Sequence, residues 1–129
     1  MTIEIRETAQ ATILDIMENL ISSPHHPEEL RKVLAGLLRS GPPNVIINFS
    51  RIQMVNGDSW GVIVRFARDF RHHDRDIKLV GLTPGLQAHF GLLHFSEVLE
   101  TYPTEEEAFA SFTNRVSRVE RNILWKMKT

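Results

Sequence analysis

The sequence contains no cysteine among its 129 residues, which excludes disulfide bridges, thiolate metal sites and thiol nucleophiles. It also lacks any run of about 18 apolar residues, the length that a membrane-spanning helix needs. The first ten residues, MTIEIRETAQ, mix charged and apolar side chains and do not form a signal segment. We therefore expect a soluble, unexported protein without direct membrane insertion, and the cytoplasm is the expected compartment.

A surplus of positive charge is also missing, since 15 basic and 16 acidic residues give a net charge of −1. This balance argues against the broad basic surface that nucleic-acid binding requires. The charge is unevenly distributed, however. Residues 113–129 hold five basic residues and one acid, a net charge of +4, so residues 1–112 carry −5. An acidic body followed by a basic segment favours contacts with protein.

Recognisable metal and cofactor motifs are absent as well. The six histidines occur as two adjacent pairs and two single residues, and no HExxH spacing exists. Zinc needs three or four converging ligands, so we expect no metal site and interpret these histidines as exposed loop residues. No phosphate-binding loop or dinucleotide fingerprint is present, and we expect no cofactor.

One segment does match a catalytic pattern. Residues 57–61 read GDSWG, which satisfies the GxSxG pattern of an esterase elbow with Ser59 as nucleophile. An elbow should directly follow a strand, whereas eight residues separate Phe49 from Asp58. A chain of this length also lacks the room that an α/β-hydrolase needs. We therefore expect no catalytic residue and no enzyme activity.

The periodicity predicts an α/β protein with the element order ββαβαβαβα. The first two strands form a hairpin that turns near Ala9-Gln10, and the third strand, NVIINF, is apolar enough to be buried on both faces. Strands alternating with helices imply a mixed sheet of four to five strands packed with about four helices. Strands are expected at residues 2–7, 11–17, 44–49, 77–82 and 98–102, and helices are expected to begin near Glu28, Asp58, Pro84 and Glu105, the last with a capping box of Thr104 and Glu107.

Three segments in this order resemble the STAS family of anti-sigma factor antagonists: NVIINFSRIQMVNGDSWGVIVRFARDF, IKLVGLTPGLQAHFGLL and YPTEEEAFASF. The resemblance covers about residues 2–112, which we interpret as one STAS domain followed by an extension at 113–129. The family pattern is an apolar strand ending in Asp-Leu-Ser, then Asp-Ser-Ser-Gly-Leu-Gly opening a helix, and later a strand Leu-Val-Gly-Leu. The resemblance implies a non-catalytic domain that regulates transcription by binding an anti-sigma factor or kinase-like partner.

In the family, a partner kinase phosphorylates the second serine of the helix-opening motif. The ungapped alignment places Asp58 at that phosphoacceptor position, whereas an alignment shifted by two residues makes Ser59 the acceptor. Asp58 can act as a permanently charged stand-in for phosphoserine or simply as a helix N-cap, and both roles can hold together. The expected partner-binding residues, flanked by loops at 22–26 and 83–85, are Asn56, Gly57, Asp58, Ser59 and Trp60.

Trp60 allows two interpretations, because it lies on the helical stripe formed by Ile63, Val64, Ala67 and Phe70. It can pack in the core beneath the helix or present an exposed aromatic anchor to a partner, and the stripe favours the core.

A second departure from the family is the sequence Glu18-Asn19-Leu20-Ile21, where the family has Gly-x-Leu-Asp near the kinase-contact surface. This difference supports an alternative hypothesis, a STAS scaffold or an accessory subunit of a stress-signalling assembly or transport system, without a phosphorylation switch.

The basic segment 113–129 is expected to form a helix through at least residues 116–123. Its apolar stripe can pack on the domain, pair with a second copy in a homodimer, or bind an acidic partner, and these three outcomes stay open. The stripe consists of Val116, Val119, Ile123 and Met127.

Overall fold

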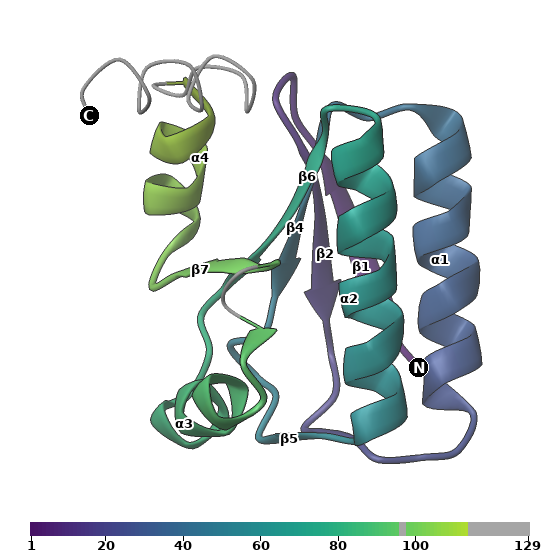
Figure 1. Ribbon diagram of the computed structural model, residues 1–129, viewed down its shortest axis with the longest axis vertical. Coiled ribbons are helices and arrows are strands. Elements are labelled where there is room, and N and C mark those ends of the chain that lie inside the picture. Colours follow the sequence, from purple (N-terminus) through teal and green to yellow (C-terminus); the bar gives the residue numbers. More distant parts are fainter. Residues whose placement is uncertain (96–97, 114–129) are drawn as a thin grey trace.

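The computed structural model describes residues 1–95 and 98–113 and forms an α/β fold built on one mixed sheet (Figure 1). The sheet has five strands in the order β1-β2-β4-β6-β7. Its first two strands are antiparallel, and every other neighbouring pair is parallel. The strands span Ile3–Glu7 (β1), Thr12–Ile16 (β2), Asn44–Asn48 (β4), Asp76–Val80 (β6) and Glu100–Tyr102 (β7).

Four helices surround this sheet in the described part of the chain. Helices α1 and α2 lie side by side on one face, and α4 lies on the opposite face (Figure 1). Helix α3 packs near the beginning of α2. The helices span His26–Ser40 (α1), Gly57–His72 (α2), Pro84–Leu92 (α3) and Glu105–Thr113 (α4).

The main core lies between the sheet and helices α1, α2 and α3. Leu14 and Ile16 from β2 meet Leu30 and Leu34 from α1 there, and all four side chains are buried. A smaller cluster on the opposite face joins Ile13 of β2 to Ala108 of α4 and other residues. Because β4 supplies Ile47 to the main core and Ile46 to the smaller cluster, it reads as the continuous apolar run of a strand buried on both faces.

The fold class predicted from the sequence is confirmed, including the opening hairpin and the five strands of the main sheet. Each helix begins within two residues of its expected position. Thr104 accepts a hydrogen bond from the backbone N–H of Glu107 at 3.2 Å, which is one of the two hydrogen bonds of the predicted capping box. The expected helix at 116–123 lies outside the described residues.

Two very short strands were not predicted. They are β3 (Leu20–Ile21) and β5 (Met54–Val55), and they pair in parallel as a separate two-stranded sheet. Strands this short carry no measurable periodicity, so neither stood out from the surrounding loops. Their position matters because β5 leads directly into α2 (Figure 1).

Candidate functional site

The first turn of α2 is held in place by Asn56, which is the N-cap of the helix. Its side-chain oxygen accepts a hydrogen bond from the backbone N–H of Ser59 at 2.9 Å. Its own backbone N–H donates to the carbonyl of Ile21 at 2.7 Å, and its side-chain amide donates to the carbonyl of Ser23 at 3.3 Å. Asn56 therefore caps α2 and ties it to the chain segment that follows β3.

Asp58 lies in this first turn, one residue after the helix begins at Gly57. The expectation that Asp58 stands at the helix N-terminus is confirmed, but the interpretation of Asp58 as the N-cap is wrong, because Asn56 holds that position. The carboxylate of Asp58 is exposed and sits where the positive end of the helix dipole favours negative charge. The negative charge of Asp58 therefore faces solvent from a fixed position in the first turn of α2.

Ser59 and Trp60 have the opposite orientation and are completely buried. The core interpretation of Trp60 is confirmed, and burial removes it from the surface that a partner can touch. The same applies to Ser59, whose hydroxyl a kinase cannot reach in this conformation. Neither Ser59 Oγ nor Trp60 Nε1 has a hydrogen-bond partner within the described residues.

Trp60 organises the aromatic cluster beneath this turn. Its ring stacks on Phe49 at 5.6 Å between centroids. It also contacts Phe90 of α3 at 5.8 Å and Phe95 at 6.0 Å. Aromatic pairs at these separations contribute about 0.5–1.5 kcal/mol beyond the area that they bury. Trp60 therefore fixes the position of α3 relative to the beginning of α2.

An apolar pair that the sequence did not reveal lies close to this turn. Leu20 of β3 and Met54 of β5 are directly paired, and both residues are 48% exposed. Gln53 donates its backbone N–H to the carbonyl of Asn19 at 2.7 Å, which extends the pairing by one residue. The alternation of these exposed residues with buried Ile21 and Val55 is the signal, but it spans only two residues per strand.

The two loops expected to flank the site differ in their connection to it. Residues 22–26 are joined to the first turn through Ser23, whose carbonyl accepts from Asn56. Residues 83–85 begin α3, where Thr83 caps the helix by accepting from the backbone N–H of Leu86 at 3.2 Å. No hydrogen bond links residues 83–85 to residues 56–59 in the described part of the chain.

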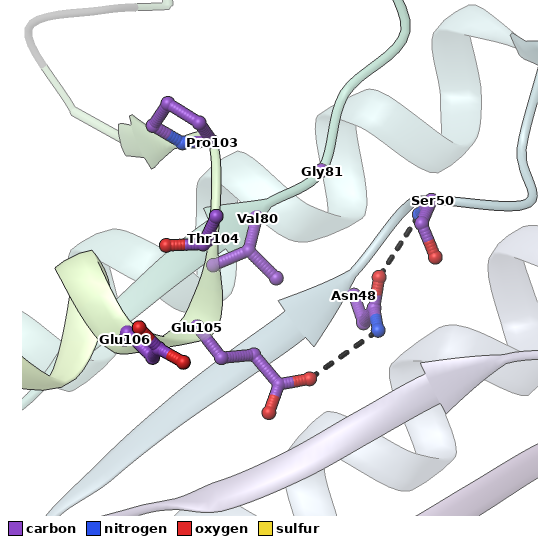
Figure 2. A pocket seen from close by; sticks show the side chains of 8 residues that line it. All are labelled: Asn48, Ser50, Val80, Gly81, Pro103, Thr104, Glu105 and Glu106. Carbon is purple, nitrogen blue, oxygen red and sulfur yellow. Dashed lines mark hydrogen bonds between the residues drawn. The ribbon is translucent and has the colours of Figure 1, made fainter.

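A separate pocket opens where strands β4 and β6 end and α4 begins, as Figure 2 shows. Asn48 is one of the residues that line the pocket. Its side-chain amide donates to Glu105 at 3.4 Å, and its side-chain oxygen accepts from the backbone N–H of Ser50 at 2.9 Å. Gly81 has a φ of +73°, and a Cβ there would stand 3.1 Å from the Cβ of Ser50. The pocket is lined by Asn48, Ser50, Val80, Gly81, Pro103, Thr104, Glu105 and Glu106.

Arg6 of β1 neutralises much of the acid beside this pocket. Its guanidinium bonds both carboxylate oxygens of Asp15, at 2.5 and 2.9 Å, and both of Glu105, at 2.5 and 3.1 Å. The hydrogen bonds from Arg6, and a further one from Asn48 at 3.0 Å, lower the pKa of Asp15. Asp15 also holds Arg6 in its charged form by raising the pKa of the guanidinium. The polar side chains Asn48 and Glu105 are thus committed to structural contacts.

Within residues 1–95 and 98–113, no three histidine, aspartate or glutamate side chains gather as metal ligands would. No helix in those ranges combines the length and apolarity required to span a bilayer.

The family model for the STAS domain matches residues 2–108 of the sequence. The chain belongs to the STAS family. The match covers every strand and the first four residues of α4, so the STAS domain includes both the first turn of α2 and the pocket beside α4. No curated protein is similar enough in sequence to count as a match.

Solved structures show the same STAS fold. A Thermotoga maritima protein assigned as an anti-sigma factor antagonist is 18% identical, with a TM-score of 0.77 over 87% of this chain and 95% of that one. The antagonist SpoIIAA in its unphosphorylated form is 17% identical, with a TM-score of 0.72 over 90% of this chain and all of that one. A STAS protein from Planctomyces limnophilus is 17% identical, with a TM-score of 0.74 over 85% and 96%.

Proposed function

We propose that this STAS domain is a non-catalytic regulator that binds an anti-sigma factor or kinase-like protein through the beginning of α2. The binding surface, here called the α2 entry surface, consists of Leu20, Met54, Asn56, Gly57 and Asp58. The observation that carries the proposal is the exposed carboxylate of Asp58 four residues after Met54, which forms an exposed apolar pair with Leu20. Binding by such a surface regulates transcription when the partner controls a sigma factor.

The apolar part of this surface supplies a reason to bind. Leu20 and Met54 are each about half exposed, although their chain neighbours Ile21 and Val55 belong to the main core. Covering such side chains contributes about 25 cal/mol for each Å² of apolar surface removed from water. Methionine also adapts its shape to a partner, because its side chain is unbranched and flexible.

The charged part of the surface, Asp58, determines whether the beginning of α2 carries a negative charge permanently or only after phosphorylation. Asp58 carries a negative charge at the positive end of a helix, whereas a serine there would become charged only on phosphorylation. The comparison structures include SpoIIAA in a phosphorylated form and a Moorella thermoacetica RsbS variant with glutamate in place of a serine. They support the compatibility of this fold with added negative charge. We infer that Asp58 fixes the domain in one binding state.

The burial of Ser59 favours a second candidate function. Ser59 is the only hydroxyl-bearing residue among positions 56–60, and its side chain is not accessible. A domain without an accessible acceptor suits a scaffold or accessory subunit of a stress-signalling assembly or transport system. That role needs the apolar pair but no phosphorylation.

The kinase-type anti-sigma factors of the source organism provide the test. Each is purified and titrated in a calorimeter with the wild-type domain, before and after incubation with ATP, and phosphate is located by mass spectrometry. We expect one of them to bind wild type equally well with and without ATP treatment and to add no phosphate. Asp58→Ser should accept phosphate, and its affinity should then change by about ten-fold, which corresponds to about 1.4 kcal/mol.

Matched control variants distinguish a loss of binding at the α2 entry surface from general effects of changing charge or apolarity. Asp74→Asn removes one negative charge beyond the opposite end of α2 and should leave binding unchanged. Met54→Ser should weaken binding, whereas Leu92→Ser, at a 79% exposed position of α3, should not. Phosphate on Ser59 of wild type would refute the fixed state. Binding to none of these kinases would favour the scaffold role.

A further inference from the structure

Strand β1 forms an open edge of the main sheet. It pairs with β2 on one side, and no strand in residues 1–95 or 98–113 pairs with its other side. Backbone hydrogen bonds continue this pairing at both ends of β1: the N–H of Thr8 donates to the carbonyl of Ala11, and the N–H of Met17 donates to the carbonyl of Thr2. Because hydrogen-bonded and non-bonded positions alternate along an antiparallel pair, the backbone groups of Ile3, Ile5 and Glu7 point away from β2. An open edge of this kind is a template for another strand.

The side chains of β1 form an unusual edge. Ile5, at its centre, is 53% exposed although it faces the same side of the sheet as buried Leu14. Glu4 and Arg6 flank it on the opposite face. Charged edge strands normally discourage pairing because they repel an added strand of like charge. The order Glu-Ile-Arg is different, because in an antiparallel second copy the acid of each strand lies opposite the base of the other.

This charge order selects one register for two antiparallel copies. Only registers that place the outward backbone groups of both copies opposite each other can form hydrogen bonds. With Ile5 opposite the partner's Ile5, Glu4 lies opposite the partner's Arg6, and the two-fold symmetry repeats this pair of opposite charges. Sliding the copies by one repeat places Glu4 opposite the partner's Glu4, or Arg6 opposite the partner's Arg6, and like charges directly opposite are unfavourable.

The charges within one copy also favour this register. Glu4 lies directly opposite Asp15, so two carboxylates share one face of the hairpin. Arg6 forms ion pairs with Asp15 and Glu105. Among the described residues, no ion pair joins Glu4 to a cation. A second copy would bring its guanidinium to the carboxylate that lacks one.

We propose that two copies of the chain associate through their β1 edges and form one continuous sheet. The strands run antiparallel, with Ile5 opposite the partner's Ile5 and Glu4 opposite the partner's Arg6. The arrangement is isologous, so each contact occurs twice about a two-fold axis. The occupant of the edge is thus a second copy of this chain, and the proposal is independent of the function assigned to the α2 entry surface.

The absence of cysteine allows a direct test by cross-linking the full chain. In this register the Cα atoms of residue 5 in the two copies are about 5.5 Å apart, within the disulfide range of about 4.4–6.8 Å. Ile5→Cys should therefore form a covalent dimer under mild oxidation. Glu7→Cys is the matched control, because it faces the partner's Ile3 and lies about 13 Å from its own counterpart; it should stay uncross-linked. Equal cross-linking of both variants would overturn the proposed register.

Sedimentation across a concentration series tests the association without oxidation. We expect wild type to dimerise and Glu4→Arg to weaken the dimer at least ten-fold, because it places Arg opposite the partner's Arg6. Glu106→Arg makes the same change of charge on exposed α4 and should have no effect. Ile5→Pro removes an outward N–H and should also abolish the dimer.

Circular dichroism serves to check that each variant is folded. A wild-type protein that stays monomeric at its highest soluble concentration would overturn the proposal. A dimer that survives both Glu4→Arg and Ile5→Pro would also overturn it and place the contact elsewhere, for example in residues 114–129.

Discussion

Two polar atoms at the beginning of α2 are buried without a hydrogen-bond partner among the described residues. Ser59 Oγ and Trp60 Nε1 are both shielded from solvent, and neither has a partner within the described residues. A buried polar group without a hydrogen bond costs about 1–3 kcal/mol. The first turn of α2 therefore combines a side-chain cap at Asn56 with two buried polar atoms that lack a partner in the described part of the chain.

Ser59→Ala should leave the domain equally stable or stabilise it by about 1 kcal/mol, because it removes a buried hydroxyl that has no hydrogen-bond partner within the described residues. Urea unfolding measures the change. Ser111→Ala is the matched control, since Ser111 accepts from Lys78 at 2.8 Å and donates to the carbonyl of Ala108 at 2.6 Å. This control should lose about 1 kcal/mol. A comparable loss in Ser59→Ala would show that its hydroxyl has a partner, such as a buried water.

The ion pairs of Arg6 connect elements that are distant in sequence. Arg6 lies on β1, Asp15 on β2 and Glu105 at the beginning of α4. One side chain therefore fastens the edge hairpin to the helix on the same face of the sheet. The exposed position of Arg6, with 47% of its side chain in solvent, limits what each pair contributes.

This cluster predicts a dependence of stability on acid. Folding lowers the pKa of Asp15, so its contribution is present above its unfolded value of about 3.9 and is lost as the pH falls through its folded value. Asp15→Asn should cost about 1 kcal/mol at neutral pH, after allowance for solvent screening, and should lose less stability on acidification than wild type. Urea unfolding at a series of pH values measures both effects.

Glu28→Gln provides the comparison for this experiment. The pKa of Glu28 is also lowered, chiefly by a hydrogen bond from Arg31, but the pair is fully on the surface. We expect the acid profile of this variant to follow that of wild type closely. Identical profiles for Asp15→Asn and wild type would contradict the role assigned to the cluster.

The elements that could be predicted from the sequence are those with length and periodicity. The run NVIINF indicated a strand buried on both faces, and the stripe through Ile63 and Phe70 indicated α2. The exposed pair of Leu20 and Met54 could not be predicted, because each belongs to a strand of two residues. The cap was misassigned for a related reason: Asn56 and Asp58 are both good N-caps, and only the backbone conformation distinguishes them.

The described elements all lie within residues 1–113, and the family match ends at residue 108. We propose that residues 113–129 are a distinct basic extension of the STAS domain. Its net charge of +4 follows a body of −5, so the two parts attract each other. The helix predicted for this segment would be marginal alone in water, and its apolar stripe would need a surface to cover.

Deleting residues 114–129 should therefore lower the melting temperature by about 4 °C for each kcal/mol of packing lost. The mass of the shortened protein in sedimentation should remain that of the proposed dimer, because the deletion leaves the β1 edge intact. A full-length variant with serine at the apolar positions of the stripe, Val116, Val119, Ile123 and Met127, separates packing from charge and should melt at the same lowered temperature. An unchanged melting temperature would show that the extension does not pack on the domain.

The burial of Trp60 also makes this domain its own optical reporter. The chain has two tryptophans, Trp60 and Trp125, so Trp125→Phe leaves a single indole. That indole is enclosed by Phe49, Phe90 and Phe95 and lies two residues from Asp58. Its emission should be shifted to short wavelength in the folded protein and should respond when the first turn of α2 rearranges. Fluorescence should therefore follow the arrival of the proposed partner at Asp58 in real time, without an attached dye.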